Sequence, residues 1–289
     1  MAEGINRTTI NLPPEVSEEI IQKVQEDSAV MQLVPQTELS GRGEEFPVIL
    51  GDPEADWVNE TDDKPVSKPA LETKIMKPYT LAVIVPFSNQ FRRDTEKLYD
   101  ELVRRLPGAL AKKFDGTVFG NYAAPGENFD TFAACTAQDI GTDAYMGLVA
   151  ADTDIAENDG ILSGFVISPK ARGVLLSAKD GNERPLFINN VADGAIPVIL
   201  GAKTLQSKAA YKAGNPSTIG IAGDWSMARW GTVEGVQGSI ADQATLTYEE
   251  DGGQKTLNLF QRNMFAVRAE IEVGFRADTS VFNLLTKSN

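Results

Sequence analysis

The sequence contains no histidine and only one cysteine, and these two shortages exclude several classes of protein. Without histidine the chain cannot build Ser-His-Asp or Cys-His catalytic groups, or the common zinc sites. A single cysteine cannot form an intrachain disulfide. Cys135 lies in the small apolar run 131–135, and a nucleophilic thiol would need a base. We therefore interpret Cys135 as a buried hydrophobic residue.

Long apolar runs and targeting segments are missing as well. No stretch approaches about 18 consecutive apolar residues, so we expect no membrane helix and no membrane partner. Residues 1–11 lack a basic segment followed by an apolar one, so we expect no secretory signal. No Gly-x-x-x-x-Gly-Lys-Ser/Thr loop is present, and no Gly-x-Gly-x-x-Gly motif follows a predicted strand, so neither glycine-rich phosphate-binding motif is found. These absences favour a protein that is made and used in the cytosol, or released from it by lysis.

The composition is that of a globular protein with a strong excess of acid. The 289 residues are 42% hydrophobic and 24% charged, enough for one large or two modest domains. The formal net charge is -14, which argues against direct binding of nucleic acid, because a phosphate backbone recruits lysine and arginine. An acidic wall that encloses nucleic acid without binding it remains compatible with this charge.

Three acidic segments are the remaining candidates for chemistry. Residues 152–160 place oxygen ligands at alternate positions, as calcium loops do, but Ala156 stands where a third ligand belongs. The pairs Glu44-Glu45 and Asp62-Asp63 are adjacent in sequence, and adjacent strand residues point to opposite faces. We predict solvated loops for all three segments, and no catalytic, cofactor-binding or metal-binding residue.

Residues 40–86 carry the most informative pattern of the chain. We predict a strand at 46–50 and a return strand at about 71–86, joined by a tip rich in Lys, Asp and Pro. Such an extended hairpin has no obvious core of its own. It is of little use to a monomeric enzyme, whereas a self-assembling protein can pack it on a neighbour. Lys64, Lys68 and Lys74 fit either pairing with acidic patches on that neighbour or plain solubility.

Apolar residues spaced three and four apart predict helices on both sides of this segment. Pro14 suits the first turn of one helix, and residues 28–33 either continue it or form a second short helix. We interpret residues 1–39 as an arm that carries a small amphipathic helix. The strongest signal is a long helix over 95–119, in which Pro107 predicts a kink and not two separate helices.

The remainder alternates helices and strands. We predict helices at 142–151 and 169–179, and strands at 160–169, 196–200, 218–222 and 230–236, which together suggest a mixed domain over about 140–256. Residues 256–275 read as one or two long strands. Trp225 and Trp230 are interpreted as core or subunit-packing residues in preference to a ligand platform.

Four segments, taken in order, resemble the major capsid proteins of tailed bacteriophages, which share the fold named after phage Hong Kong 97. No single segment is specific, but their order and spacing over about residues 45–285 are. The segments are Ala55-Asp56-Trp57-Val58-Asn59-Glu60 with the Pro-Val-Ser-Lys-Pro tip and the exit strand 81–88; the long helix ending at Phe114-Asp115-Gly116; 164–169 with 175–186; and 223–225 with 235–244, 260–269 and Phe282.

The resemblance implies an α+β fold with four parts. Residues 1–39 would form an N-terminal arm and 40–86 the extended β-hairpin loop, which lies over an adjacent subunit. Residues 87–139 and 257–289 would form a peripheral domain with the long spine helix, and 140–256 an axial domain around pentamer and hexamer centres. Within the loop, the predicted intersubunit contact residues are Trp57, Glu60, Asp62, Asp63, Lys64 and Lys68.

The implied function is that of a structural subunit, not an enzyme, and it needs no cofactor. Pentamers and hexamers of the chain would build the icosahedral head around the double-stranded DNA of a tailed phage, first as a procapsid that later expands. The expected partners are further copies of the chain, a separate scaffolding protein, a portal and a decoration protein. The expected location is the virion, after assembly in the cytoplasm of the host bacterium.

Two alternatives stay open on the sequence alone. An encapsulin, a bacterial compartment shell, has the same fold and encloses an enzyme cargo. A mixed α/β enzyme would have to rely on carboxylates, lysine or a bound metal. Some phage relatives crosslink a loop lysine to an asparagine of a neighbour; Lys64 or Lys68 would supply the amine, but the sequence identifies neither the asparagine nor the catalytic acid.

Overall fold

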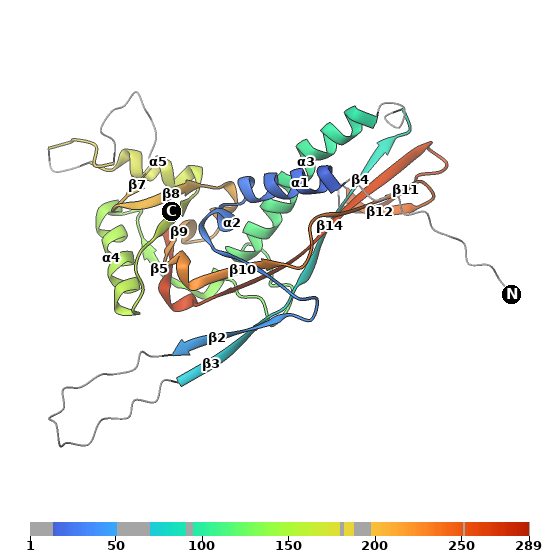
Figure 1. Ribbon diagram of the computed structural model, residues 1–289. Helices are drawn as coiled ribbons and strands as arrows, with labels where there is room; N and C mark the ends of the chain where they lie inside the picture. The colour runs from blue at the N-terminus through green and yellow to red at the C-terminus, as the bar shows by residue number, and fades with distance from the viewer. Residues whose placement is uncertain are drawn as a thin grey trace, which may run out of the picture.

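The computed structural model describes residues 14–50, 70–90, 95–179, 182–187, 198–250 and 252–288. Two β-sheets lie end to end, and helices pack on both of them (Figure 1). Five α-helices are described: α1 (Pro14–Asp27), α2 (Ala29–Leu33), α3 (Thr95–Val118), α4 (Ala144–Glu157) and α5 (Pro169–Ser177).

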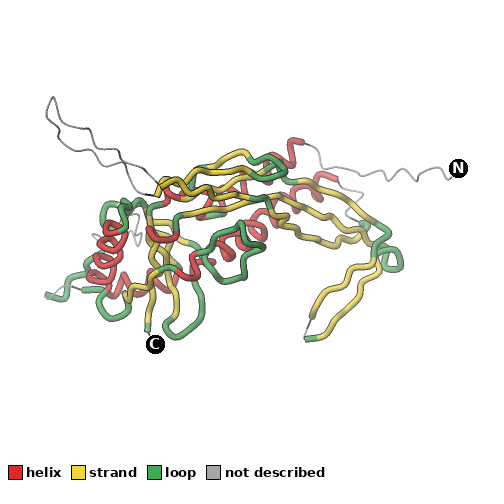
Figure 2. Tube along the Cα trace, turned by 90° about the horizontal axis from the view of Figure 1, so that it is seen from below, coloured by secondary structure: helices red, strands yellow, loops and turns green. Residues whose placement is uncertain are grey.

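The first sheet has β14 as its central strand. β14 pairs antiparallel with all ten residues of β4 along one edge, from Met264↔Ser88 to Val273↔Tyr79. Its other edge pairs with β10 and β11, and β10 carries β1 in parallel. Figure 2 shows these long strands running beside α3. The strands are β1 (Gln36–Glu38), β4 (Tyr79–Ser88), β10 (Ala228–Thr232), β11 (Gln237–Ala241) and β14 (Met264–Ala277).

The second sheet has the strand order β5-β15-β9-β6-β8-β7, with α4 and α5 packed on it. Its strands are β5 (Thr136–Asp139), β6 (Gly164–Ile167), β7 (Val198–Ile199), β8 (Ala202–Gln206), β9 (Ser217–Gly223) and β15 (Phe282–Lys287). Two separate hairpins complete the described strands: β2 (Glu44–Leu50) with β3 (Ala70–Met76), and β12 (Thr245–Glu250) with β13 (Gly253–Asn258).

The long helix α3 is one continuous element with Pro107 inside it, as predicted. Its described apolar stripe is buried at four-residue intervals, at Leu102, Leu106, Leu110 and Phe114. A helix tolerates an internal proline at the loss of one hydrogen bond when packing along its length compensates. The stripe supplies that packing, because α3 lies between the first sheet and α1.

Several elements differ from the prediction. The single return strand is two strands, because Pro78 has no N–H to continue a ladder and the partner changes there from β2 to β14. The final segment, predicted as one or two strands, forms two, β13 and β14, separated by a turn in which Asn263 has a φ of 54°. Glu44 and Glu45, predicted in a loop, begin β2.

The pairing of strands does not follow the predicted domain boundaries. β10 and β11 lie inside 140–256 but pair with β14 of the first sheet. β15 lies inside 257–289 but pairs with β9 and β5 of the second sheet. Sequence order misleads here because strand pairing joins residues that are distant in the chain. The division into an arm, a loop, a peripheral and an axial domain stays a prediction.

One continuous apolar core spans both sheets. Phe132 and Phe282 stack with ring centroids 4.3 Å apart, and Trp225 meets both rings edge-on. Trp225 and Trp230 are almost fully buried, which confirms their interpretation as packing residues. Their indole N–H groups donate to backbone carbonyls, of Gly164 at 2.9 Å and of Val34 at 3.1 Å, so neither buried donor lacks a partner.

Candidate functional site: the base of the extended hairpin

The hairpin of β2 and β3 projects from the body of the molecule (Figure 1). Its antiparallel register runs from Glu44↔Met76 to Leu50↔Ala70, which confirms the predicted pair of strands at its base. All six predicted contact residues, Trp57, Glu60, Asp62, Asp63, Lys64 and Lys68, lie in 51–69, outside the described residues. The described part of the site is therefore the base of the hairpin, where it joins the first sheet.

Arg276, near the end of β14, fastens this base by hydrogen bonds to three acceptors in two separate segments, at Ile75 and at 128–130. Its Nε donates to the carbonyl oxygen of Ile75 at 2.8 Å, and its Nη1 donates to the Asp130 carboxylate at 2.7 Å. Its Nη2 donates to the side-chain oxygen of Asn128 at 3.1 Å. We call Ile75, Met76, Asn128, Asp130 and Arg276 the hairpin anchor.

The ion pair within the anchor is shielded from water. The Arg276 and Asp130 side chains are 14% and 20% exposed, whereas the pair between Arg268 and Glu270 on the same strand is 50% and 29% exposed. The second Asp130 oxygen accepts the Ala277 N–H at 3.1 Å, so both carboxylate oxygens have donors. Planar, charge-assisted contacts of this kind are the stronger and more directional hydrogen bonds of proteins.

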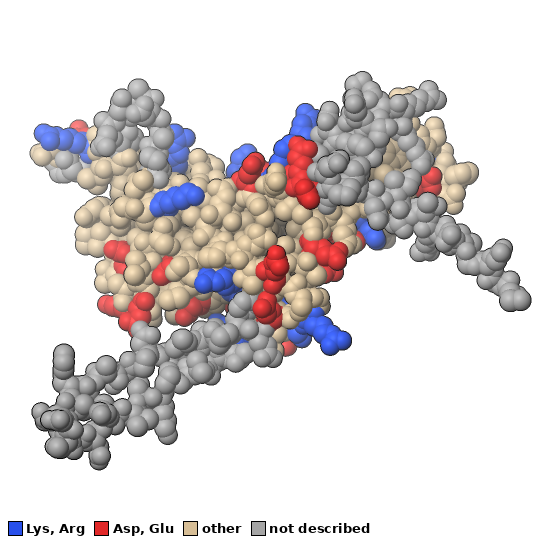
Figure 3. Space-filling model, viewed as in Figure 1, with Lys and Arg blue, Asp and Glu red and all other residues tan. Residues whose placement is uncertain are grey.

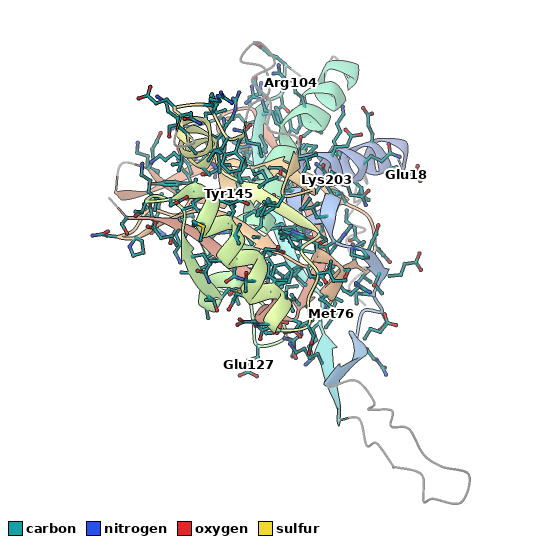
Figure 4. All side chains as sticks on the ribbon, turned by 90° about the vertical axis from the view of Figure 1, so that its left-hand side faces the viewer. Glu18, Met76, Arg104, Glu127, Tyr145 and Lys203 are labelled. Carbon is teal, nitrogen blue, oxygen red and sulfur yellow. The ribbon has the colours of Figure 1, made fainter. Side chains whose placement is uncertain are left out.

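Close packing complements these polar contacts. Met76 is fully buried where the hairpin leaves the body (Figure 4), and it lies against Gly274. A Cβ at Gly274 would stand 2.7 Å from Met76 Cγ and 2.9 Å from the Lys77 carbonyl oxygen. The strand can approach this closely only because residue 274 has no side chain.

Lys74 belongs to the same junction. Its Nζ donates to the Ala277 carbonyl oxygen at 3.1 Å, within the chain. The described structure thus uses this lysine for the base of the hairpin, while pairing with a neighbour's acidic patch and solubility stay predictions for the lysines of this segment.

A second polar cluster fastens the N-terminal helices to α3. Asp115 is buried, and its carboxylate accepts from Ser28 Oγ at 2.5 Å, Ala29 N at 2.9 Å and Val30 N at 3.4 Å. Burial raises the pKa of Asp115 to about 6, although these hydrogen bonds act to lower it. Ile20 and Val24 are buried beside it, so residues 18–34 are part of the packed body.

The other candidates for chemistry offer no reactive arrangement. Asp152, Asp154 and Glu157 lie in helix α4, which continues past the predicted end because Ala151 and Ile155 extend its buried face. Within the described ranges no cluster of three or more carboxylates or thiols is placed to hold a metal ion. Burial raises the pKa of Cys135 to about 12, so its thiol stays protonated near neutral pH. No helix of the described part is long and apolar enough to cross a membrane.

Sequence reasoning missed the anchor. Asp130 and Arg276 are 146 residues apart, and neither lies in a motif. The one local signal was the glycine at 274 in an otherwise apolar strand, which is typical of close approach by another backbone.

Comparison with known proteins places the chain in a family. A sequence profile described as "Phage capsid family" matches residues 9–279. The probable major capsid protein gp17 of Mycobacterium phage D29 is 28% identical over 290 residues, covering 95% of this chain and 89% of that protein. The major capsid protein of Staphylococcus phage 80alpha is 24% identical, covering 93% of this chain and 83% of that protein.

Solved structures of phage chains have a fold similar to that of this protein. A chain from Microbacterium phage Oxtober96 superposes with a TM-score of 0.70 at 21% identity, covering 90% of this chain and 91% of that one. A chain from Gordonia phage Cozz gives 0.68 at 21% identity, covering 91% and 87%. The protein belongs to the phage capsid family. The predicted α+β fold of the Hong Kong 97 type is confirmed.

Proposed function

We propose that this protein is the major capsid protein of a tailed phage. Copies of the chain would assemble as pentamers and hexamers into the icosahedral head that encloses the double-stranded DNA genome. The observation that carries the proposal is the match of one family to residues 9–279, nearly the whole chain. The curated relatives are phage capsid proteins, which favours the virus over an encapsulin.

We further propose that residues 40–86 clamp a neighbouring subunit. An isolated two-stranded hairpin is marginally stable in water, so a long one needs a surface to pack on. The anchor fixes the base of this hairpin against β14 by hydrogen bonds, which supports a firm attachment of the hairpin to the body. On this proposal Trp57, Glu60, Asp62, Asp63, Lys64 and Lys68 contact the next copy of the chain.

The same proposal assigns the chain no catalytic role. It places the protein in the virion, with assembly in the host cytoplasm. Scaffolding, portal and decoration proteins are its expected partners. The division into an N-terminal arm, extended loop, peripheral domain and axial domain belongs to this proposal too.

Electron microscopy of the purified protein tests the function directly. We expect uniform closed shells on the order of 10–100 nm, because a closed point group gives one particle size. A protein that stays monomeric at every concentration, with or without its scaffolding protein, would contradict the proposal. Genes for portal, terminase and tail proteins beside its own gene would distinguish a phage from an encapsulin, whose neighbours encode a cargo enzyme.

A further inference from the structure

Lysines gather around one cleft of this acidic protein. The cleft has a volume of about 330 Å³ and lies between the C-terminal half of α3 and residues 208–213. Lys112, Lys208 and Lys212 line it together with Tyr122 and Tyr211. No acidic residue is among its lining residues.

The two tyrosines hold two more lysines at the cleft. Lys113 Nζ lies 3.4 Å from the ring centroid of Tyr122, and Lys170 Nζ lies 3.8 Å from that of Tyr211. Lys212 is positioned by a 2.7 Å hydrogen bond from its Nζ to the Gly120 carbonyl oxygen. We call Lys112, Lys113, Lys170, Lys208 and Lys212 the lysine cluster.

The acidic residues of the described part do not neutralise the cluster by ion pairing. None of the ion pairs formed among described residues includes one of its lysines. The segments 102–114 and 194–223 together contain seven basic residues and no Asp or Glu. Asp115, the nearest acid in sequence, is buried and turned to the N-terminal helices. At physiological ionic strength charges interact over about 8 Å, so the cluster acts through its local charge and not through the net charge of the chain.

Charged side chains of both signs lie on the face of the molecule that Figure 3 draws. Basic side chains lie along its upper edge, over α5 and near α3, where acidic side chains lie as well. Acidic side chains gather along the lower edge, over α4.

We propose that the lysine cluster binds the phosphate backbone of the enclosed double-stranded DNA. This inference rests on the proposed capsid function. Lysine ammonium groups act as point charges for phosphate without reading sequence, and tyrosine hydroxyls also donate to phosphate oxygens. Hot spots of protein interfaces lie in well-packed, desolvated pockets, whereas lysines line this cleft and Lys113 and Lys170 each lie over a tyrosine ring. The face that carries the cluster would therefore be turned to the inside of the shell.

The test compares two variants of the full chain with matched loss of charge. The first is Lys112→Gln/Lys208→Gln/Lys212→Gln, and the control is Lys23→Gln/Lys77→Gln/Lys255→Gln, three lysines outside the cluster. Binding of each unassembled protein to duplex DNA of about 30 base pairs is followed by fluorescence anisotropy over a salt series. Circular dichroism checks that both variants fold.

We expect the cluster variant to bind at least about tenfold more weakly than the control, with a salt slope lower by about 2 to 3, since each lost phosphate contact removes about 0.9. Equal affinity and slope in the two variants would overturn the proposal, and so would a wild type that does not bind DNA in about 20 mM salt. Poly-glutamate of matched charge is the competitor. If it binds the cluster more tightly than DNA does, the partner is an acidic peptide and the proposal is wrong.

Electron microscopy separates this inference from the function on which it rests. Shells of the wild type without a DNA effect of the cluster would leave the capsid function standing and remove the DNA contact. Failure of the wild type to form shells would remove the capsid function itself.

Discussion

Arg276 is the residue at which three distant parts of the chain meet. It joins the carbonyl of Ile75, the carboxylate of Asp130 and the amide oxygen of Asn128. Only a guanidinium has enough donors, in a fixed plane, to serve three acceptors at once. The orientation of the hairpin against the first sheet therefore depends on this side chain, together with Lys74 and the packing of Met76 on Gly274.

Replacing Arg276 by Ala should lower the free energy of unfolding by about 2 to 4 kcal/mol, because Asp130 is left shielded from water without its cation. Urea denaturation of the purified chain measures this. The matched control is Arg268→Ala, which breaks a more exposed pair on the same strand and should change the free energy by less than about 1 kcal/mol. Equal losses of unfolding free energy in the two variants would show that the ion pair of the anchor stabilises the fold no more than an exposed pair does.

The close packing of Met76 on Gly274 can be tested separately from the hydrogen bonds of the anchor. Gly274→Ala should destabilise by about 1 to 3 kcal/mol, because its Cβ would overlap Met76 and the Lys77 carbonyl. Gly173 in α5 is the control: a Cβ there meets nothing within 4 Å, so Gly173→Ala should stabilise by up to about 1 kcal/mol. Thermal unfolding of both variants gives the comparison. A Gly274→Ala protein as stable as the wild type would show that the close approach at residue 274 does not require glycine.

Asp115 should give the stability of the protein a pH dependence. Its folded pKa, about 6, exceeds its ordinary value of 3.8, so between these values the folded state binds more protons than the unfolded state. The contribution of Asp115 is fully present below about pH 4 and is lost as the pH rises through 6, by up to about 3 kcal/mol.

The measurement is the difference in unfolding free energy between wild type and Asp115→Asn, determined from about pH 4 to pH 7. Asparagine keeps an acceptor for the Ala29 N–H but does not titrate. We expect the wild type to lose stability relative to the variant as the pH rises. A constant difference over this range would contradict the role of burial at this carboxyl.

At the scale of elements, one pair of strands holds the sheet together and another pair projects from it. β4 and β14 pair over ten residues and form a long ribbon, and the β2–β3 hairpin leaves the end of that ribbon. The change of partner at Lys77-Pro78 lets one polypeptide serve both, since β3 ends in the hairpin before the proline and β4 joins the sheet after it. The hairpin can thereby extend from the body while its base stays part of the core.

Deleting the tip from Asn59 to Pro69 should leave a soluble folded chain but prevent stable shells. The reason is that the base of the hairpin carries its own hydrogen bonds within the chain, whereas the proposed clamp acts on a neighbour. Circular dichroism checks the fold, and electron microscopy with heating checks the shells. A Gly/Ser tip of equal length is the control for reach. Shells of wild-type stability from the deleted protein would show that the clamp role is wrong.

At the scale of the whole molecule, one core joins two sheets. Phe132, Trp225 and Phe282 pack on the second sheet, while Phe275 of the first sheet meets Phe132 at 5.7 Å between centroids. Neither sheet is formed by one continuous segment of the chain: β10, β11 and β14 belong to the first sheet, and β15, which follows them, belongs to the second. A contiguous core of this kind predicts that both sheets unfold together.

Tryptophan fluorescence can test this on a Trp57→Phe background. Trp230 reports on the first sheet when Trp225 is replaced by Phe, and Trp225 reports on the second sheet in the converse variant. We expect each probe to give the same midpoint as circular dichroism of the same variant in denaturant. Two separated transitions would mean that the peripheral and axial parts are independent units.

Much of the local structure followed from the sequence. The four-residue apolar spacing from Leu102 to Phe114 placed α3, and the paired strands at the base of the hairpin followed from alternation and turn residues. The placement of Glu44 and of Asp152–Glu157 in loops was wrong, since a run of acidic residues is as compatible with the exposed side of a strand or helix as with a loop. The six contact residues of the tip stay a prediction.

By itself the sequence determined the class of fold, the capsid resemblance and the absence of histidine chemistry, because residue spacing and composition are local properties of the chain. Only the tertiary structure decided which strands share a sheet, how Arg276 fastens the hairpin and why the lysines of α3 meet Lys208 and Lys212. The hydrogen bonds of Arg276 reach residues 146 to 201 positions away, and no local periodicity encodes a partner at that distance.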